Sequence, residues 1–525
     1  MRIALLITSL LTAITVSASH AEDLALEPIN VGTPSKIEVF PAAIKIAGAR
    51  RHMQLVVTGH YADGTLQDLT RAAQFATSNA AVAVVDNAVA QPKGDGAAEI
   101  VVTVGGQEAK VPVEVSAFAT PQPISFEFET LAALSKQGCN SGACHGSPSG
   151  KGGFRLSLRA FDPSIDKLTL IREDLGRRTN PLSPEESLLL NKPLMKVPHG
   201  GGLKLKKSEP AFALLRQWIA EGCQPDKADA PRCVKIEVYP PSGRVLKRPA
   251  HTQQLAVLAH FADGTTRDVT DMACYSSSDS MVAEVNEQGL VVGHDRGEAA
   301  IIIRYLEHVE SCFLTFVKDI ESFAWNNPPT INYIDEHVDA KLQQLKYLPS
   351  GTCSDEEFLR RVHLDVIGQL PTLEETQAFL ADGAPDKRAK LIDNLLDRPE
   401  YARFFALKWG DLLRLTTTQI GGPGAFKYHR WVQRAFESNM PYDQFAHELL
   451  AATGSTLNNP AANFYRTATD TQDCVESISQ IFLGARLQCA KCHNHPFEKW
   501  TQDNYYGMAA FFNRVQRKKS PRADE

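Results

Sequence analysis

Several features that would assign this chain to a common class are missing from its sequence. After the N-terminus, no apolar run is long enough to cross a membrane as a helix. A formal net charge of −6 lacks the excess of lysine and arginine that marks nucleic-acid-binding proteins. The chain contains no phosphate-binding glycine loop, no G-x-S-x-G nucleophile motif and no H-E-x-x-H zinc helix. We therefore expect no nucleic-acid partner. The absence of these catalytic motifs does not decide whether the protein is an enzyme.

Residues 1–21 are typical of a secretory signal peptide. Arg2 precedes an apolar run, and the small residues Ser19 and Ala21 occupy the −3 and −1 positions of a cleavage site. We therefore expect an exported protein, periplasmic or at the cell surface, with no transmembrane segment after cleavage. Because thiols of exported proteins are oxidised or ligated, the ten cysteines are expected in disulfides or in cofactor sites.

An internal repeat occupies much of the first 320 residues of this 525-residue chain. KIEVFP near the start of the first copy corresponds to KIEVYP in the second, and GHYADGTLQDLT corresponds to AHFADGTTRDVT. Short alternating runs with Asp-Gly turns predict strands joined by hairpins, hence a small β-sandwich in each copy. The order of features resembles bacterial immunoglobulin-like domains of group 2, at 34–117 and 233–318. The resemblance implies spacer or adhesive domains, with a cell-surface glycan as a candidate partner.

The segment between the two copies, residues 124–223, carries a cysteine–histidine motif instead of a strand pattern. A short predicted helix leads into Cys139, Cys144 and His145, spaced as C-x4-C-H. The haem attachment motif is C-x-x-C-H, in which both thiols bond to haem vinyl groups and the histidine binds iron. Here two extra residues separate the thiols. A helix, a motif, a loop and a closing helix predict a small cytochrome c domain. The alternative is a Cys139–Cys144 disulfide without haem.

Two side chains compete for the second axial position of this iron. Met195 would give His/Met ligation and a raised potential, whereas His199 would give bis-His ligation and a lower one. His199 lies in His-Gly-Gly-Gly, and glycines let a loop backbone approach a ligand closely. We therefore favour His199.

The C-terminal part, residues 320–515, has the apolar periodicity of helices. Ser354 with Glu357 and Thr372 with Glu375 predict capping boxes at two helix starts.

This helical part ends in a second motif, Cys489-Ala490-Lys491-Cys492-His493, with the C-x-x-C-H spacing of covalent haem. His495 follows as a further candidate ligand. The alternative is a zinc ion held by Cys489, Cys492, His493 and His495, all of which are ligand types that zinc accepts.

Longer stretches around both motifs resemble one protein family. FLRRVHLDVIGQLPT and FLGARLQCAKCHNHPFEKWTQDNYYGMAAFF are similar to the planctomycete-type cytochrome-c-like domain of unknown function, over residues 330–515. QGCNSGACHGSPSGKGGFRLSLRAFDP and the HGGG loop resemble the cytochrome-like module that often precedes it. The resemblance implies two covalent haem c groups, and it supplies no substrate.

Six cysteines remain outside the motifs. One pairing out of fifteen keeps every bridge within one domain or joint. The predicted disulfides are Cys223–Cys233, Cys274–Cys312 and Cys353–Cys474.

The predicted fold class is multidomain, with two all-β immunoglobulin-like sandwiches and two α-helical cytochrome c-like domains. The predicted function is electron transfer by an exported multihaem c-type cytochrome, with a redox partner protein. One alternative is a surface interaction or adhesion protein whose cysteine motifs are structural zinc or disulfide sites. Another is a haem-dependent oxidase acting on extracellular polymers, which needs an open position on the iron.

Overall fold

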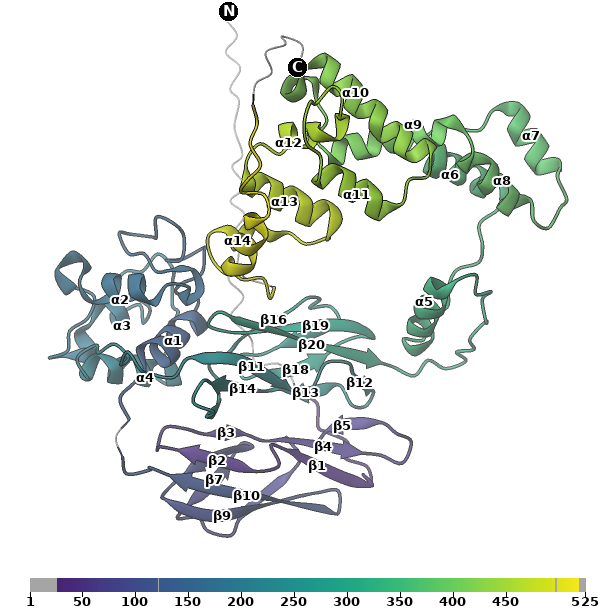
Figure 1. Ribbon diagram of the computed structural model, residues 1–525. Coiled ribbons are helices and arrows are strands. Elements are labelled where there is room, and N and C mark those ends of the chain that lie inside the picture. The colour runs from purple at the N-terminus through teal and green to yellow at the C-terminus, as the bar shows by residue number, and fades with distance from the viewer. Residues whose placement is uncertain (1–25, 121, 496–497, 519–525) are drawn as a thin grey trace, which may run out of the picture. The chain divides into compact units, whose positions relative to one another are not determined.

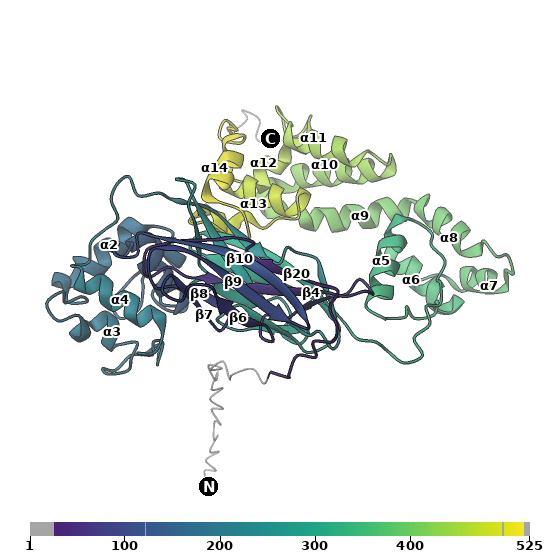
Figure 2. The same cartoon turned by 90° about the horizontal axis from the view of Figure 1, so that it is seen from below.

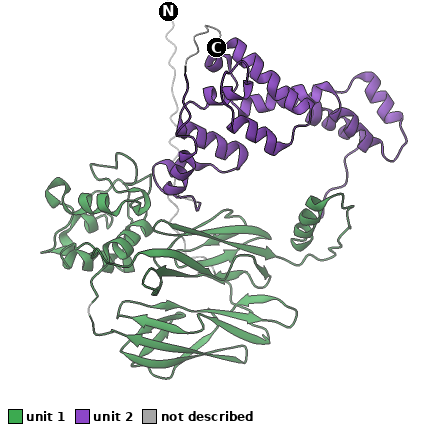
Figure 3. Ribbon diagram, in the orientation of Figure 1, with its two compact units in different colours: residues 1–347 green, residues 348–525 purple. Residues whose placement is uncertain are grey.

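The computed structural model describes residues 26–120, 122–495 and 498–518, so the predicted signal peptide lies outside the described residues (Figure 1). The chain divides into two compact units, residues 1–347 and 348–525 (Figure 3). The first unit contains β-sandwich sheets and a helical module, and the second is helical. The protein is therefore multidomain, as the sequence predicts. Among the described residues, no helix combines the length and apolar character that a membrane span requires.

The first copy of the repeat folds into three antiparallel or mixed sheets that enclose one apolar core. The sheet orders are β1-β4-β5, β2-β10-β9-β6 and β3-β8-β7. The long hairpin β9–β10 faces the viewer in Figure 2. Along β10, the apolar residues Val111, Val113 and Val115 are buried and alternate with exposed ones, which is the half-buried strand pattern. The strands are β1 (Lys36–Phe40), β2 (Ile44–Ala47), β3 (Met53–Gln54), β4 (Val56–His60), β5 (Leu66–Asp68), β6 (Gln74–Thr77), β7 (Ala83–Asp86), β8 (Val89–Pro92), β9 (Gly96–Val104) and β10 (Gln107–Ser116).

The second copy repeats this topology strand for strand. Its sheets are β11-β14-β15, β12-β20-β19-β16 and β13-β18-β17, the same orders shifted by ten strands. The strands are β11 (Cys233–Tyr239), β12 (Arg244–Lys247), β13 (Thr252–Gln254), β14 (Ala256–Phe261), β15 (Thr266–Asp268), β16 (Cys274–Ser277), β17 (Ala283–Val285), β18 (Leu290–Gly293), β19 (Gly297–Tyr305) and β20 (His308–Val317).

Equivalent residues of the two sandwiches bond to one another reciprocally. The buried Asp68 carboxylate accepts a hydrogen bond from the Gln254 backbone N–H at 2.6 Å, and Asp268 accepts one from the Gln54 backbone N–H. Burial raises the pKa of both carboxyls above their ordinary value. Because Asp68 and Asp268 occupy the same place in each copy, the sequence repeat produces the same contact in both directions.

A helical module of the first unit, residues 124–223, separates the two copies in the sequence. Its core contains Leu134, Leu190 and Trp218, all fully buried. Pro210 opens its last helix, where a missing N–H costs nothing, and Phe212, Leu215 and Trp218 of that helix face the core. Its helices are η1 (Phe126–Thr130), α1 (Leu131–Lys136), η2 (Leu158–Ala160), α2 (Pro163–Ile171), η3 (Glu173–Gly176), η4 (Pro184–Glu186), α3 (Leu188–Asn191) and α4 (Pro210–Ala220).

Polar contacts attach the start of this module to both sandwiches. Lys136, the last residue of α1, donates hydrogen bonds to the backbone carbonyls of Ala273 and Glu287 in the second sandwich. Arg51 of the first sandwich forms an ion pair with Glu129 at 3.2 Å. The segment that leads directly into Cys139 is thus positioned from both sides.

The helices that follow the second sandwich carry the predicted caps. The first, α5 (Tyr333–Gln344), belongs to the first unit, and the others lie in the second. Thr372 and Glu375 form the predicted capping box, and the Ser354 side chain accepts from the Glu357 N–H without a reciprocal bond among the described residues. The second unit contains α6 (Asp355–Ile367), α7 (Leu373–Ala381), α8 (Lys387–Leu396), α9 (Pro399–Leu412), α10 (Thr417–Glu437), α11 (Tyr442–Leu450), η5 (Pro460–Asn463), α12 (Phe464–Thr467), α13 (Thr471–Phe482), η6 (Leu487–Lys491) and α14 (Gln502–Ala510).

The three predicted disulfides are absent, because all ten cysteines have free thiols in the structure. The Cys274–Cys312 bridge is excluded by strand order. Cys274 on β16 pairs with Arg304, whereas Cys312 on β20 pairs with Ile301, and β19 lies between those two strands. Two strand spacings of about 4.8 Å separate their backbones by roughly 10 Å. That exceeds the Cα separation of about 7 Å beyond which a disulfide cannot form.

The other two predicted bridges are also corrected. Cys223 and Cys233 are buried thiols, and burial raises the pKa of both. Cys474 is buried, and its thiol donates to the Ala468 carbonyl at 3.7 Å instead of bonding to Cys353. The assumption that each bridge stays within one domain or joint therefore did not predict which cysteines are paired.

Candidate functional site

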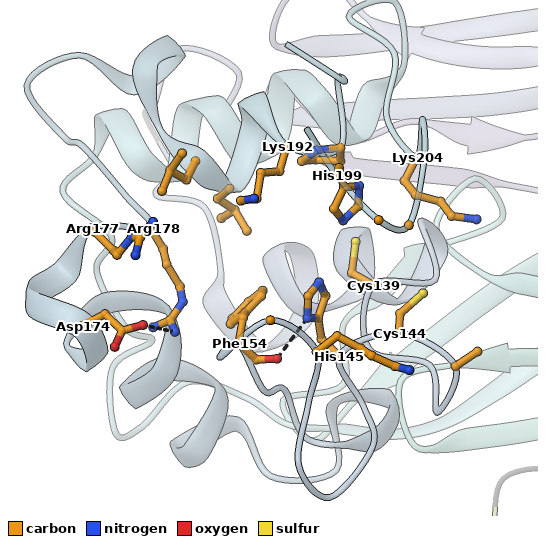
Figure 4. Close-up of a pocket in the computed structure, with 18 residues that line it drawn as sticks. Cys139, Cys144, His145, Phe154, Asp174, Arg177, Arg178, Lys192, His199 and Lys204 are labelled. Atoms are coloured by element: carbon orange, nitrogen blue, oxygen red, sulfur yellow. Dashed lines mark hydrogen bonds and ion pairs between the residues drawn. The ribbon is translucent and has the colours of Figure 1, made fainter. Parts of the chain in front are cut away.

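A cavity of about 470 Å³ lies in the helical module of residues 124–223, and both thiols of the first motif line it (Figure 4). Its size falls in the range of small-molecule sites. Four candidate residues line it: Cys139, Cys144, His145 and His199. The structure therefore brings together side chains from two segments that are more than fifty residues apart in the sequence.

The motif is a closed turn that follows α1 directly. The Cys139 backbone N–H donates to the Leu134 carbonyl at 2.9 Å, and the His145 N–H donates to the Cys139 carbonyl at 3.0 Å. Of the four residues between the thiols, Asn140 is buried and its side-chain amide donates to the Ser135 hydroxyl at 2.8 Å, whereas Gly142 and Ala143 are exposed. Gly146 permits this closure, since a Cβ there would lie 2.1 Å from the Asn140 carbonyl oxygen.

Cys139 is the more enclosed of the two thiols. Burial raises the pKa of its thiol to about 12, with a smaller contribution from neighbouring Cys144. A protonated thiol behaves as a small apolar side chain, so Cys139 contributes apolar surface to the cavity.

The two histidine rings face each other across the cavity (Figure 4). Their centroids are 6.3 Å apart and their planes differ by 15°. His145 Nδ1 bonds to the Phe154 carbonyl at 3.0 Å, and His199 Nδ1 bonds to the Gly202 carbonyl at 2.8 Å. A carbonyl on Nδ1 fixes the proton there and leaves Nε2 as the metal-binding nitrogen. Burial lowers the pKa of His145, which favours the neutral ring that metals bind.

Met195, the competing axial candidate, does not line the cavity. It lies after α3 with a positive φ of 57°, and 48% of its surface is exposed. The structure thus places His199, and not Met195, opposite His145.

Charged side chains at the cavity are mostly basic, and most of them were not singled out from the sequence. Arg178 is buried and forms an ion pair with Asp174 at 2.7 Å, while its guanidinium lies 4.8 Å from the Phe154 ring. The adjacent arginines of the GRRTN segment are the only feature of the sequence that points to this basic side of the cavity. The charged residues that line the cavity are Lys151, Asp174, Arg177, Arg178, Lys192 and Lys204.

The second motif lies at the surface of the second unit. Cys489, in η6, and Cys492 are both exposed. His493 Nδ1 bonds to the Asn494 carbonyl at 2.7 Å, and the His495 backbone N–H donates to the Trp500 carbonyl at 2.8 Å.

Aromatic side chains beside this motif differ in burial. Tyr505 is fully buried and packs with Leu487, Ala490 and Val475, whereas 84% of Phe511 is exposed. Pro496 and Phe497 lie outside the described residues. Within the described ranges, no group of three or more His, Cys, Asp or Glu side chains is arranged to hold a metal ion.

One comparison with known protein families concerns the C-terminal part. Residues 333–517 match the family model PSCyt2, described as a protein of unknown function (DUF1549). This match supports the predicted planctomycete-type domain of unknown function there, and it does not extend to the sandwiches or to the first motif.

Two further comparisons add no function. No curated protein matches the chain. Among solved structures, the S-layer protein SbsC, domains 5–6, has 10% identity and a TM-score of 0.24, covering 55% of this chain and 99% of that one. A structure of surface layer protein SbsC, domains 4–9, has 9% identity and a TM-score of 0.23, covering 55% and 32%. These scores are too low to establish a shared fold.

Proposed function

We propose that this protein is an exported multihaem c-type cytochrome that transfers electrons to or from a redox partner protein. One observation carries the proposal: Cys139, Cys144, His145 and His199 converge on a single cavity. Two thiols supply covalent attachment and two facing imidazoles supply axial ligands, which is the complete donor set of a bis-His c-type haem.

The residues present fit this group. Imidazole nitrogens bind first-row metals at about 2.0 Å, so a ring separation of 6.3 Å leaves room for one metal ion between His145 and His199. The second ring nitrogen of each histidine is already satisfied by a carbonyl, as is usual for ligating histidines. Each thiol, Cys139 or Cys144, would add its S–H across a vinyl C=C bond. A C–S bond forms, the hydrogen goes to the other vinyl carbon, and no oxidant is consumed.

When bound, haem supplies one-electron transfer. The chain's own residues would set how readily it does so. His145 and His199 would both serve as iron ligands, and a haem with two histidine ligands favours electron transfer over oxygen chemistry. Phe154 and Leu189 line the cavity with apolar surface and reduce the access of water.

We extend the proposal to Cys489, Cys492 and His493 on the strength of their C-x-x-C-H spacing. Both thiols are exposed and therefore accessible to a haem vinyl group. A second haem would give the protein two redox centres. Export, proposed from residues 1–21, would deliver the chain to the compartment where c-type haem is attached.

Mass spectrometry of the mature chain, produced with active haem maturation, tests the proposal. We expect two covalent haem additions. Cys139→Ala with Cys144→Ala should remove one, and Cys489→Ala with Cys492→Ala should remove the other. A reduced-minus-oxidised spectrum of the same samples separates haem from zinc or disulfides. No addition would refute the proposal, and a single addition that is lost on Cys489→Ala would refute it for the cavity.

A further inference from the structure

The cavity of the first module has two chemically different ends. The thiols of Cys139 and Cys144 lie at one end, and Arg177 and Arg178 lie at the other, with the facing imidazole rings between them (Figure 4). A haem is also polar along one direction, because its two vinyl groups lie toward one edge of the porphyrin and its two propionate carboxylates toward the opposite edge. Thiols that hold the vinyl edge therefore direct the carboxylates toward the arginine end.

The two arginines differ in how far their donors are already used. Arg178 is buried, donates to the Asp174 carboxylate at 2.7 Å and to the Thr169 carbonyl at 2.6 Å, and lies against the Phe154 ring. The exposed Arg177 side chain has no hydrogen-bond or ion-pair partner among the residues that the structure describes. Arg178 is thus a fixed part of the wall, and Arg177 has donors available for an anion.

The charge around the cavity also fits a dianionic ligand. Five basic residues line the cavity and a single carboxylate, that of Asp174, opposes them. Carboxylates that leave bulk water require charged or hydrogen-bonding partners. The planar guanidinium of arginine matches a carboxylate with two parallel hydrogen bonds, which lysine cannot do.

We propose that Arg177 binds a propionate carboxylate of the haem, so that the group lies with its vinyl edge at Cys139 and Cys144 and its carboxylate edge at Arg177. The assignment rests on the proposed function, because it presupposes that haem occupies this cavity. The assignment adds a carboxylate-binding site to the proposed function. It also selects one of the two orientations, related by reversal of the haem edges, that a haem could take between His145 and His199.

The test measures binding of haemin and of haemin dimethyl ester, whose carboxylates are masked, to full-length protein without thioether bonds. The background carries alanine at the four motif cysteines and His493→Ala, so that His145 and His199 remain as the facing pair. We expect haemin to bind more tightly than its ester. Arg177→Gln should lower this preference about tenfold, equivalent to about 1.4 kcal/mol, and Arg177→Lys should restore part of it.

Two matched variants make the result specific. Lys196 is exposed and does not line the cavity, so Lys196→Gln should leave the preference unchanged. Lys204 lies at the thiol end in Figure 4, so Lys204→Gln should reduce the preference less than Arg177→Gln does. An unchanged preference in Arg177→Gln, or a larger loss in Lys204→Gln, would overturn the assignment while haem still binds. Failure of the background protein to bind either compound would instead count against the proposed haem site of this cavity, and would overturn this assignment with it.

Discussion

The two cysteine–histidine motifs differ in their surroundings in a way that their spacing does not indicate. The second motif has the standard C-x-x-C-H spacing, yet Cys489 and Cys492 are exposed on the surface of their unit. The first motif has two extra residues, yet its thiols line a cavity and its histidine faces a second one. Spacing along the chain determines whether two thiols can reach one porphyrin. The cavity and the distal ligand come from elsewhere in the fold, as His199 does here.

The largest difference that we expect between the motifs is in thiol reactivity. In reduced, haem-free protein at pH 8, a thiol with a pKa of about 12, such as Cys139, is thiolate in about one part in ten thousand. That fraction is about a thousandfold smaller than in an ordinary exposed thiol. Because Cys489 and Cys492 are exposed, we expect them to react with iodoacetamide much faster than Cys139.

Peptide mapping after timed alkylation measures this difference in rate. Denatured protein is the control, since all motif thiols should then react at similar rates. If Cys139 reacts as fast as Cys489 in the native chain, the cavity does not enclose it, and the contrast between the two motifs disappears.

The second expected difference is in the distal ligand. In a Cys489→Ala, Cys492→Ala background, only the haem of the first motif remains. His199→Ala should change its spectrum from low-spin to high-spin, because one axial ligand is lost. Met195→Leu should not change the spin state, since Met195 lies outside the cavity lining. The reverse pattern would transfer the ligand role to Met195.

Local sequence patterns predicted the parts of this molecule that local interactions determine. The Asp-Gly turns and alternating residues of the repeat predicted two sandwiches, and Thr372 with Glu375 predicted a helix start, because each signal acts over a few residues. The pairing of Cys274 with Cys312 failed because it depends on which strands are neighbours, a property of the whole sheet.

The cavity could be predicted from the sequence only in part. Its two histidines are marked by local sequence patterns, a cysteine motif before His145 and three glycines after His199. Almost no sequence pattern marks Arg177 and Arg178, because they reach the cavity only where the chain returns to it after α2. Residues that meet through such a long return share no periodicity or motif that a single sequence displays.

The smallest expected difference is in how pH affects a carboxylate near each motif. Asp166 in α2 is buried and accepts from the Ser157 N–H at 2.5 Å and its hydroxyl at 2.6 Å. Burial nevertheless raises its pKa to about 6. The folded state therefore binds this proton more tightly than the unfolded state, and the contribution of Asp166 to stability declines as pH rises from about 4 to about 6. Near the second motif, Asp473 is subject to the opposite effect: partial burial opposes ionisation, but an ion pair with Arg414 at 2.9 Å lowers its pKa.

Asparagine substitutions at these two positions should therefore act with opposite signs at pH 7. Asp166→Asn keeps an acceptor for the Ser157 N–H and removes a buried charge. The first unit should therefore lose less stability between pH 4 and pH 7 than the parent does, by up to about 3 kcal/mol.

Asp473→Asn removes a favourable ion pair, whose contribution to stability is present above the unfolded-state pKa and is lost as pH falls. The variant should therefore destabilise the second unit at pH 7 and have little effect in acid. Thermal unfolding of each variant against the parent at pH 4 and pH 7 measures both effects, and the subtraction cancels other titrating groups such as Asp68. If both variants changed the free energy of unfolding at pH 7 in the same direction, burial would not be the main influence on the pKa of Asp166. The two motif regions would then be electrostatically alike.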